Sequence, residues 1–288
     1  MSRVRHISFI EVSSALGIIH PMKLNDVRVP GLAGVSPEAV PLHIALVTET
    51  YPPEINGVAM TLGRMVTALR ERGHRVDVVR PRQAEDGVLL ALEGEDTLVK
   101  GLPIPGYGDL RFGLPAKRIL LQRWSQQRPH IVHIATQGPL GWSARKAARA
   151  LGLPVSSGFH TNFDAYSRHY GVGWMQAPIA RFLRSFHNGT DATMVPTRSL
   201  ARSLLSGGYR NVSVVSRGID TQLFSPQRRC ASLRAAWQAK PDDLVVAYVG
   251  RLAPEKNLDL VFATFSEMLR ARHDAKLVLV GDGPLYAA

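Results

Sequence analysis

The sequence has a single cysteine, Cys230, among its 288 residues, so no disulfide can form within one chain. This sparing use of cysteine is typical of a reducing compartment and predicts a cytoplasmic protein. Cys230 ends the polar segment QRRC at 227–230, where we interpret it as an incidental thiol rather than a nucleophile.

Long hydrophobic runs are also missing, and none approaches the ~20 residues that a membrane-spanning helix needs. The first apolar stretch, residues 7–19, is interrupted by Glu11 and is not followed by a convincing signal-peptide cleavage site. We therefore expect residues 1–40 to form an N-terminal extension without clear structure, and Met22 provides an alternative start.

Acidic residues are scarce relative to basic ones: 23 Asp and Glu stand against 35 Lys and Arg, a formal net charge of +12. Such a balance favours anionic partners. The arginines are scattered and accompany no zinc-finger, RNP or helix-turn-helix signature, so we expect no nucleic-acid partner. Two interpretations stay open for one basic group, docking on the anionic inner face of the plasma membrane or a plain solvated surface. The group comprises Arg181, Arg184, Arg198 and Arg202.

From residue 42 onward, short apolar runs alternate with segments of helical periodicity, which predicts an α/β fold with a doubly wound parallel sheet. We expect this first domain to span residues 41–219. Its expected strands cover 42–47, 75–79, 131–134, 155–159, 192–195 and 212–215, and its expected helices cover 58–72, 115–127, 140–151, 175–188 and 198–206.

A second doubly wound domain begins in the remaining residues, 220–288, after a linker. The expected strands are 244–249 and 276–280, and the expected helices are 232–238 and 258–272. Parallel sheets covered on both faces usually have four or more strands, so two strands predict an incomplete domain.

Asn56 and Gly57 follow the first expected strand and directly precede a helix. A glycine there lets the backbone approach a ligand, and the helix N-terminus presents free N–H groups to a phosphate. An ordinary glycine-bearing turn is the alternative interpretation.

The segment GFHTNFDAY at 158–166 follows another expected strand and places His160, Asp164 and Tyr166 in one polar cluster. This mixture suits a hydroxyl-rich ligand better than a core. We expect no metal, because no further histidine or carboxylate stands at zinc-ligand spacing.

Arg251 and Lys256 lie on either side of a turn after the strand at 244–249. Two cations near a helix N-terminus are unfavourable for the helix itself, but they suit a diphosphate bound between them. Gly281 and Gly283 follow the last strand, where glycines permit the close approach of a nucleotide. Surface basic residues and an ordinary turn are the alternative interpretations.

Together these motifs resemble those of glycosyltransferase family 4, the retaining enzymes of GT-B type with two Rossmann-like domains. The resemblance covers residues 42–284 and is greatest to the GDP-mannose-dependent α-mannosyltransferases. It rests on ETYPP at 49–53, NGV at 56–58, FHT at 159–161, SRGIDTQLF at 216–224, VGRL at 249–252 and EKN at 255–257.

The resemblance implies a role for each matched residue. Asn56, Gly57, Gly281 and Gly283 would contact the nucleotide-sugar donor, GDP-mannose being favoured. Arg251 and Lys256 would hold the diphosphate as the sugar leaves, and His160 would contact the transferred hexose. Asp164 and Tyr166 would face a lipid or glycan acceptor. The family implies neither a metal nor another cofactor.

The sequence also departs from the family, whose second domain carries a Glu-x7-Glu element further along than residue 288. We therefore expect this chain to be a C-terminally truncated fragment whose own activity is impaired. A catalytically inactive relative that binds acceptor or membrane is the alternative. A nucleotide-sugar epimerase, which shares the two-domain plan, is a third interpretation.

Overall fold

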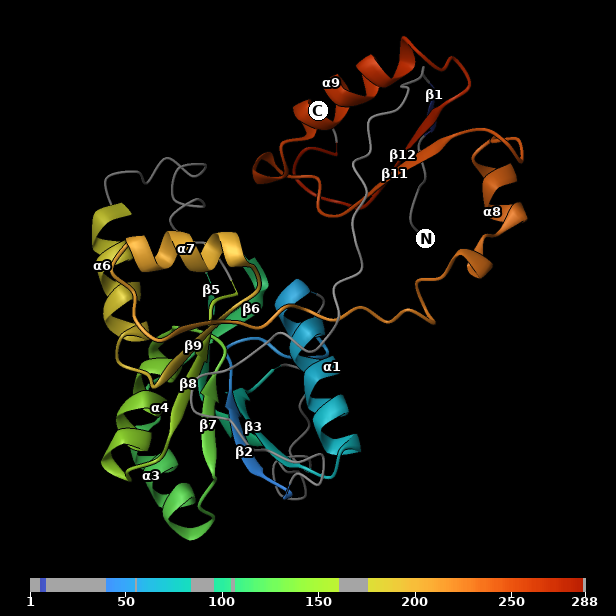
Figure 1. Ribbon diagram of the computed structural model, residues 1–288. Helices are drawn as coiled ribbons and strands as arrows, with labels where there is room; N and C mark the ends of the chain where they lie inside the picture. The colour runs from blue at the N-terminus through green and yellow to red at the C-terminus, as the bar shows by residue number, and fades with distance from the viewer. Residues whose placement is uncertain are drawn as a thin grey trace. The chain divides into compact units, whose positions relative to one another are not determined.

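The computed structural model describes residues 6–8, 40–54, 56–83, 96–104, 107–160 and 176–286. The chain divides into two compact units, and each is described by itself (Figure 1). One unit comprises Val27–Gly218, and the other comprises Ile219–Ala288 together with Met1–Asp26. The domain boundary expected between residues 219 and 220 lies one residue from this division.

The unit Val27–Gly218 is built on a seven-stranded sheet with the order β10-β9-β8-β7-β2-β3-β4. Every neighbouring pair is parallel, so the α/β doubly wound architecture is confirmed. The strands are β2 (His43–Val47), β3 (Arg75–Pro81), β4 (Thr97–Val99), β7 (Ile131–Ile134), β8 (Val155–Gly158), β9 (Ala192–Val195) and β10 (Val212–Val214).

Helices cover both faces of this sheet (Figure 1). On one face, α1 (Gly57–Glu71) buries Leu62 and Val66 against residues of β2 and β3. On the other, α3 (Lys117–Gln126) and α4 (Pro139–Ala150) bury a larger apolar cluster that includes Leu120. Successive side chains of a strand point to opposite faces of the sheet, so one strand contributes residues to both apolar clusters.

Two further helices, α6 (Gln176–His187) and α7 (Arg198–Ser206), pack together beside β8 and β9. Leu183 of α6 and Leu204 of α7 share a buried cluster with Phe159, which follows β8. This packing fixes the chain at the carboxyl end of β8, next to His160.

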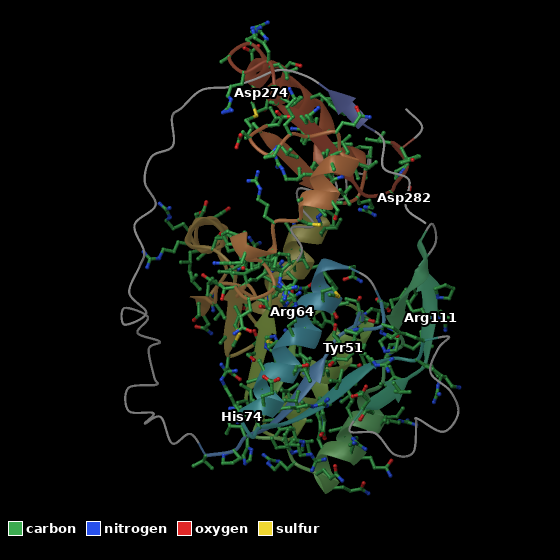
Figure 2. The ribbon with its side chains drawn as sticks, turned by 90° about the vertical axis from the view of Figure 1, so that its right-hand side faces the viewer. Tyr51, Arg64, His74, Arg111, Asp274 and Asp282 are labelled. Carbon is green, nitrogen blue, oxygen red and sulfur yellow. The ribbon has the colours of Figure 1, made fainter. Side chains whose placement is uncertain are left out.

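The expected elements of this unit are all present, with ends within about two residues of the expected ones. The sequence interpretation missed β4 and the antiparallel hairpin of β5 (Gly101–Ile104) and β6 (Tyr107–Gly113). Figure 2 labels Arg111 on this hairpin and His74 just beyond the C-terminal end of α1.

The other unit contains a three-stranded sheet with the order β1-β12-β11. β11 (Val245–Val249) and β12 (Lys276–Val280) are parallel, and α9 (Leu258–Leu269) packs Phe265 against them. A short helix, α8 (Ala231–Ala236), and two 3-10 turns, η3 (Pro226–Arg228) and η4 (Pro254–Lys256), complete this unit.

The first strand, β1 (His6–Ser8), pairs antiparallel with β12. It belongs to residues 1–40, which we expected to lack clear structure, so that expectation does not hold for these three residues; the other residues before Val40 lie outside the described ones. Across the described parts of the chain, no helix has the length and apolar character needed to cross a membrane.

Candidate functional site

The candidate site of the larger unit lies where the strand order reverses. β2 pairs with β7 on one side and with β3 on the other. The chain leaves β2 for α1 on one face of the sheet and leaves β7 for α4 on the opposite face. Open α/β sheets bind ligands in the crevice that forms at such a point, at the carboxyl ends of the strands.

Asn56 and Gly57 lie at the end of the β2 loop. Asn56 is the N-cap of α1, and its Oδ1 accepts hydrogen bonds from the N–H groups of Val58 at 3.1 Å and Ala59 at 2.9 Å. Gly57 is exposed, and a Cβ atom added to it would meet nothing within 4 Å. The fold itself does not require a glycine here, so the open backbone leaves room for a ligand.

A polar network braces the loop that carries Gly57. Asn56 Nδ2 donates to Thr50 Oγ1 at 2.7 Å, and Thr50 Oγ1 donates to the Glu54 carboxylate. Gln83 Nε2 donates to Glu54 Oε1 at 2.7 Å and to the Tyr51 carbonyl at 3.0 Å. Burial raises the pKa of Glu54, and its hydrogen bonds with Thr50 and Gln83 oppose that shift. The loop is thus held by its own side chains and by Gln83, which follows β3.

Glu49 is a residue of this site that the sequence interpretation left without a role. Its carboxylate accepts from the N–H of Gly113 on β6 and, at 3.2 Å, from the N–H of Leu140 in the first turn of α4. The Glu49 N–H donates to Thr136 Oγ1 at 2.8 Å. Burial raises the Glu49 pKa to about 7, although backbone N–H groups stabilise the charged form.

His160 lies two residues after β8, at the same edge of the sheet. A Cβ on Gly158 would overlap the His160 Nε2 atom, so a glycine is needed beneath the ring. This Nε2 is buried and has no hydrogen-bond partner among the described residues. Burial, together with the charge of Arg217, lowers the His160 pKa to about 4. At neutral pH the site therefore presents an uncharged imidazole that can pair with a ligand hydroxyl.

His133 lies beside His160, beneath the carboxyl edge. Its Nδ1 forms a hydrogen bond with Ser156 Oγ on the neighbouring strand, at 2.9 Å. Its Nε2 lies 3.4 Å from the place where a Cβ of Gly158 would stand, so both histidines border the same point. Burial, with the nearby His160, lowers the His133 pKa to about 4.

A second buried hydrogen-bond network holds the backbone of Gly158. Gln137 Nε2 donates to the Gly158 carbonyl at 3.0 Å and lies 3.1 Å from His187 Nε2. The His187 Nδ1 lies 2.9 Å from Ser157 Oγ. The signal for this network in the sequence is the presence of polar residues, His133, Ser156 and Ser157, within otherwise apolar strands.

In the smaller unit, Arg251 and Lys256 are both exposed. Arg251 follows β11, and its carbonyl accepts from the Tyr248 hydroxyl at 2.9 Å. Lys256 is the last residue of η4, and Asn257 then adopts a left-handed conformation before α9 begins at Leu258. Arg251 therefore precedes a 3-10 turn and Lys256 ends it, and neither lies in the first turn of the helix.

Gly281 and Gly283 follow β12, and the structure gives a reason for both. A Cβ on Gly281 would overlap the Gly250 carbonyl, and one on Gly283 would overlap the Leu252 carbonyl. The loops after β11 and β12 stay paired, because Gly250 N–H donates to the Val280 carbonyl at 2.9 Å. The close approach that these glycines allow is to the protein's own backbone, and contact with a donor stays a prediction.

The remaining predicted site residues, Asp164 and Tyr166, lie outside the described residues. Within the described ranges, no three His, Cys, Asp or Glu side chains gather as a metal site would require. The structure brings Asn56, Gly57 and His160 to one edge of a single sheet, and it places Arg251 and Lys256 in the other unit.

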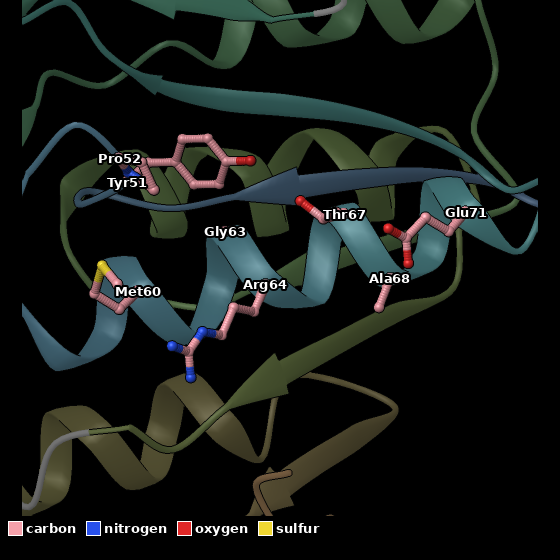
Figure 3. A pocket seen from close by; sticks show the side chains of 8 residues that line it. All are labelled: Tyr51, Pro52, Met60, Gly63, Arg64, Thr67, Ala68 and Glu71. Carbon is pink, nitrogen blue, oxygen red and sulfur yellow. The ribbon is translucent and has the colours of Figure 1, made fainter. Parts of the chain in front are cut away.

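An open groove of about 420 Å³ runs along the outer side of α1 (Figure 3). Pro52 packs over Gly63 there, since a Cβ on Gly63 would stand 2.8 Å from Pro52 Cγ. No predicted site residue lines the groove, whose lining consists of Tyr51, Pro52, Met60, Gly63, Arg64, Thr67, Ala68 and Glu71.

The chain matches the models of two known protein families. The model of Glycosyltransferase Family 4 matches residues 55–223, more than half of the chain. The chain belongs to Glycosyltransferase Family 4. Residues 231–287 of this family 4 chain also match the model of Glycosyl transferases group 1.

Among curated relatives, the family 4 chain is 32% identical to the GDP-mannose-dependent alpha-mannosyltransferase of Mycolicibacterium smegmatis, covering 84% of this chain and 64% of the relative. It is 29% identical to the enzyme of that name from Corynebacterium glutamicum, covering 85% and 58%. It is 26% identical to the alpha-monoglucosyldiacylglycerol synthase of Streptococcus pneumoniae, covering 84% and 56%. The chain thus spans less than two thirds of the length of these relatives.

Solved structures with a similar fold include the catalytic domain of starch synthase IV from Arabidopsis thaliana, bound to ADP and acarbose. The TM-score is 0.55 at 14% identity, over 85% of this family 4 chain and 69% of that one. This likeness confirms the GT-B type of α/β fold that the sequence predicted.

Proposed function

We propose that the protein is a hexosyltransferase that moves a hexose from a nucleotide-sugar donor to a lipid or glycan acceptor. The similarity to GDP-mannose-dependent alpha-mannosyltransferases, 32% identical over 84% of the chain for one of them, carries this proposal. It favours mannose as the sugar and GDP-mannose as the donor. The relative named alpha-monoglucosyldiacylglycerol synthase supports a lipid acceptor and keeps glucose as the sugar to test beside mannose.

The proposed chemistry needs neither a metal nor another cofactor. Arg251 and Lys256 hold the donor diphosphate and offset the charge that develops on it as the sugar leaves. Gly281 and Gly283 contact the nucleotide-sugar donor, as do Asn56 and Gly57, which approach its phosphates. His160, uncharged at neutral pH, pairs with a hydroxyl of the sugar, and Asp164 and Tyr166 face the acceptor. Transfer retains the anomeric configuration, with the leaving phosphate taking the acceptor proton.

The test is a donor and acceptor screen on the protein isolated from its source cells. GDP-mannose and UDP-glucose are each offered with a lipid extract of those cells, and labelled product is separated and its anomer assigned by NMR. We expect an α-linked product, with transfer at least a hundredfold slower in His160→Ala and Lys256→Ala. An inverted anomer would overturn retention. Binding of lipid without transfer would favour an inactive relative, and conversion of the donor without acceptor would favour an epimerase.

We also propose a cytoplasmic site of action at the inner face of the plasma membrane. The arginines of α6 and α7 supply the positive charge that anionic lipids attract, and Arg181, Arg198 and Arg202 are exposed. Each of the two helices also exposes an apolar side chain, Phe182 with 48% and Leu205 with 52% of its surface exposed. The Phe182 ring packs on Trp142 of α4, with ring centroids 5.2 Å apart. Arg184 also donates to the Gly207 carbonyl at 2.9 Å, which links the two helices.

A further inference from the structure

The helix α4 begins without a capping group of its own. Its N-cap is Gly138, which has no side chain, and its first turn contains no acidic residue. Helix N-termini carry unpaired N–H groups and a partial positive charge, so a cap is normally supplied. Here the cap is Glu49, whose Oε1 accepts from the Leu140 N–H at 3.2 Å across 91 positions of sequence.

The surroundings of Glu49 are shaped to its side chain. A Cβ on Gly138 would overlap the Glu49 carboxylate, and one on Gly113 would stand 3.0 Å from its Oε2. A Cβ on Gly141 would overlap the carbonyl of Thr136, the residue whose hydroxyl accepts from the Glu49 N–H. Gly113 on β6 and Gly138 at the N-cap of α4 thus leave the space in which the loop after β2, β6 and α4 meet at one carboxylate.

The bonds of Glu49 continue into the loop that carries the proposed donor contact. Thr50, the next residue, accepts from Asn56 Nδ2 at 2.7 Å. Asn56 in turn caps α1 through the N–H groups of Val58 and Ala59. These hydrogen bonds, linked through the backbone between Glu49 and Thr50, form a polar chain from the N-terminus of α4 to that of α1, and Gly57 lies at its far end.

We propose that Glu49 is a positioning residue for Gly57, setting the place of the β2 loop by anchoring its base to α4 and β6. A carboxyl group suits this role because its two oxygens can accept N–H groups from two elements at once. This inference rests on the proposed function for its catalytic consequence, since Gly57 is the proposed phosphate contact. The polar chain itself can be tested without any substrate.

Amide hydrogen exchange measured residue by residue gives that test, because it reports local opening. In Glu49→Ala, exchange at Leu140 should accelerate, and exchange at Val58 and Ala59 should accelerate about fivefold, the factor expected for a weakened cap. Glu49→Gln, which keeps one acceptor oxygen, should restore most of the protection. Thr50→Val should accelerate exchange at Val58 and Ala59 while leaving Leu140 unchanged.

Glu71→Ala, at the opposite end of α1, is the matched control and should leave all of these amides unchanged. Faster exchange at Leu140 alone in Glu49→Ala would make Glu49 a local cap and overturn the proposal, as would an unaltered α1 in Thr50→Val. If Glu49→Ala does not fold, Glu49→Gln and Thr50→Val decide the matter, since the proposal requires the smaller change in the first and the selective change in the second.

Donor kinetics separate this inference from the proposed function. In Glu49→Ala we expect the KM for GDP-mannose to rise several-fold and kcat to change less, because the donor contact shifts while His160 stays in place. Glu49→Gln should restore most of the wild-type KM. A wild-type protein that transfers no sugar would refute the proposed function and leave the exchange result standing. Unchanged KM in a protein that does transfer sugar would refute the positioning role.

Discussion

Glu49 is a carboxyl group whose ionisation the fold opposes. Burial raises its pKa from 4.5 to about 7, even though it accepts bonds from backbone N–H groups. Because the folded protein binds this proton more tightly than the unfolded chain does, the stabilising contribution of Glu49 is greatest below pH 4.5. It declines as the pH rises toward 7.

We therefore predict that Glu49→Gln removes a pH dependence from the stability of the protein. Relative to the variant, the wild-type free energy of unfolding should fall by on the order of 2–3 kcal/mol between pH 4.5 and pH 8, at ~1.4 kcal/mol for each unit of pKa shift. Chemical denaturation of both proteins at four pH values measures the difference. Parallel curves for the two proteins would show that Glu49 ionises normally.

Substitution by alanine should have different effects at two glycines of the candidate site, lowering stability at Gly138 and donor affinity at Gly57. Gly138→Ala places a methyl group on the Glu49 carboxylate and should destabilise the fold by about 1–3 kcal/mol. Gly57→Ala meets nothing within 4 Å, so stability should change by less than about 0.5 kcal/mol while donor affinity falls. Thermal melts and donor titrations of both variants check this, and a destabilised Gly57→Ala would contradict it.

Among the helices, α1, α4 and α7 illustrate different sources for a cap. Asn56 and Thr197 cap the helices that follow them, with Thr197 Oγ1 accepting from the Leu200 N–H at 3.1 Å. Such local caps can be read from the sequence, because Asn or Thr stands directly before an apolar periodic segment. The cap of α4 comes from Glu49 and cannot be read in this way.

At this scale we predict that Asn56→Ala costs about 1 kcal/mol of unfolding free energy, the usual loss on removing such a cap. Asn56→Asp keeps an acceptor for Val58 and Ala59 and should recover most of that loss. Urea denaturation of the two variants gives the comparison. Equal stability of Asn56→Ala and wild type would mean that the cap contributes nothing.

The elements that the sequence predicted are those whose pattern is local. Buried parallel strands such as residues 131–134 appear as short apolar runs, and the helices between them keep a regular apolar spacing. The hairpin of β5 and β6 was missed because its glycines, proline and short length resemble a loop. The partners of Glu49 were hidden for another reason, because they lie 64 and 91 positions away along the chain.

At the scale of the whole molecule, charge is the property that the sequence states most directly. The excess of basic residues, +12 in net charge, favours anionic ligands and surfaces. The sequence alone left the arginines of α6 and α7 open to two interpretations. The structure adds that Phe182 and Leu205 are exposed on the same two helices. The proposal of membrane docking rests on this combination of arginines and exposed apolar side chains.

We predict salt-sensitive binding to vesicles that contain anionic phospholipid. Sedimentation at 50 mM salt should recover most of the protein with the vesicles, and 500 mM salt should release at least half of it by screening the charge. Phe182→Ser should weaken binding at both concentrations, whereas Ile119→Ser, an exposed apolar residue on α3, serves as the control. Binding that ignores salt, or none at low salt, would remove the membrane proposal.

The interlock of Glu49 with Gly138 and Gly113 also has an evolutionary consequence. A side chain added at position 138 or 113 would collide with Glu49, and loss of Glu49 would remove the cap of α4. We therefore expect these positions to change in pairs during evolution. Homologues in which residue 138 carries a side chain should therefore have a shorter residue, or none able to reach α4, at position 49. We therefore expect positions that lie far apart along the gene to change together at this junction.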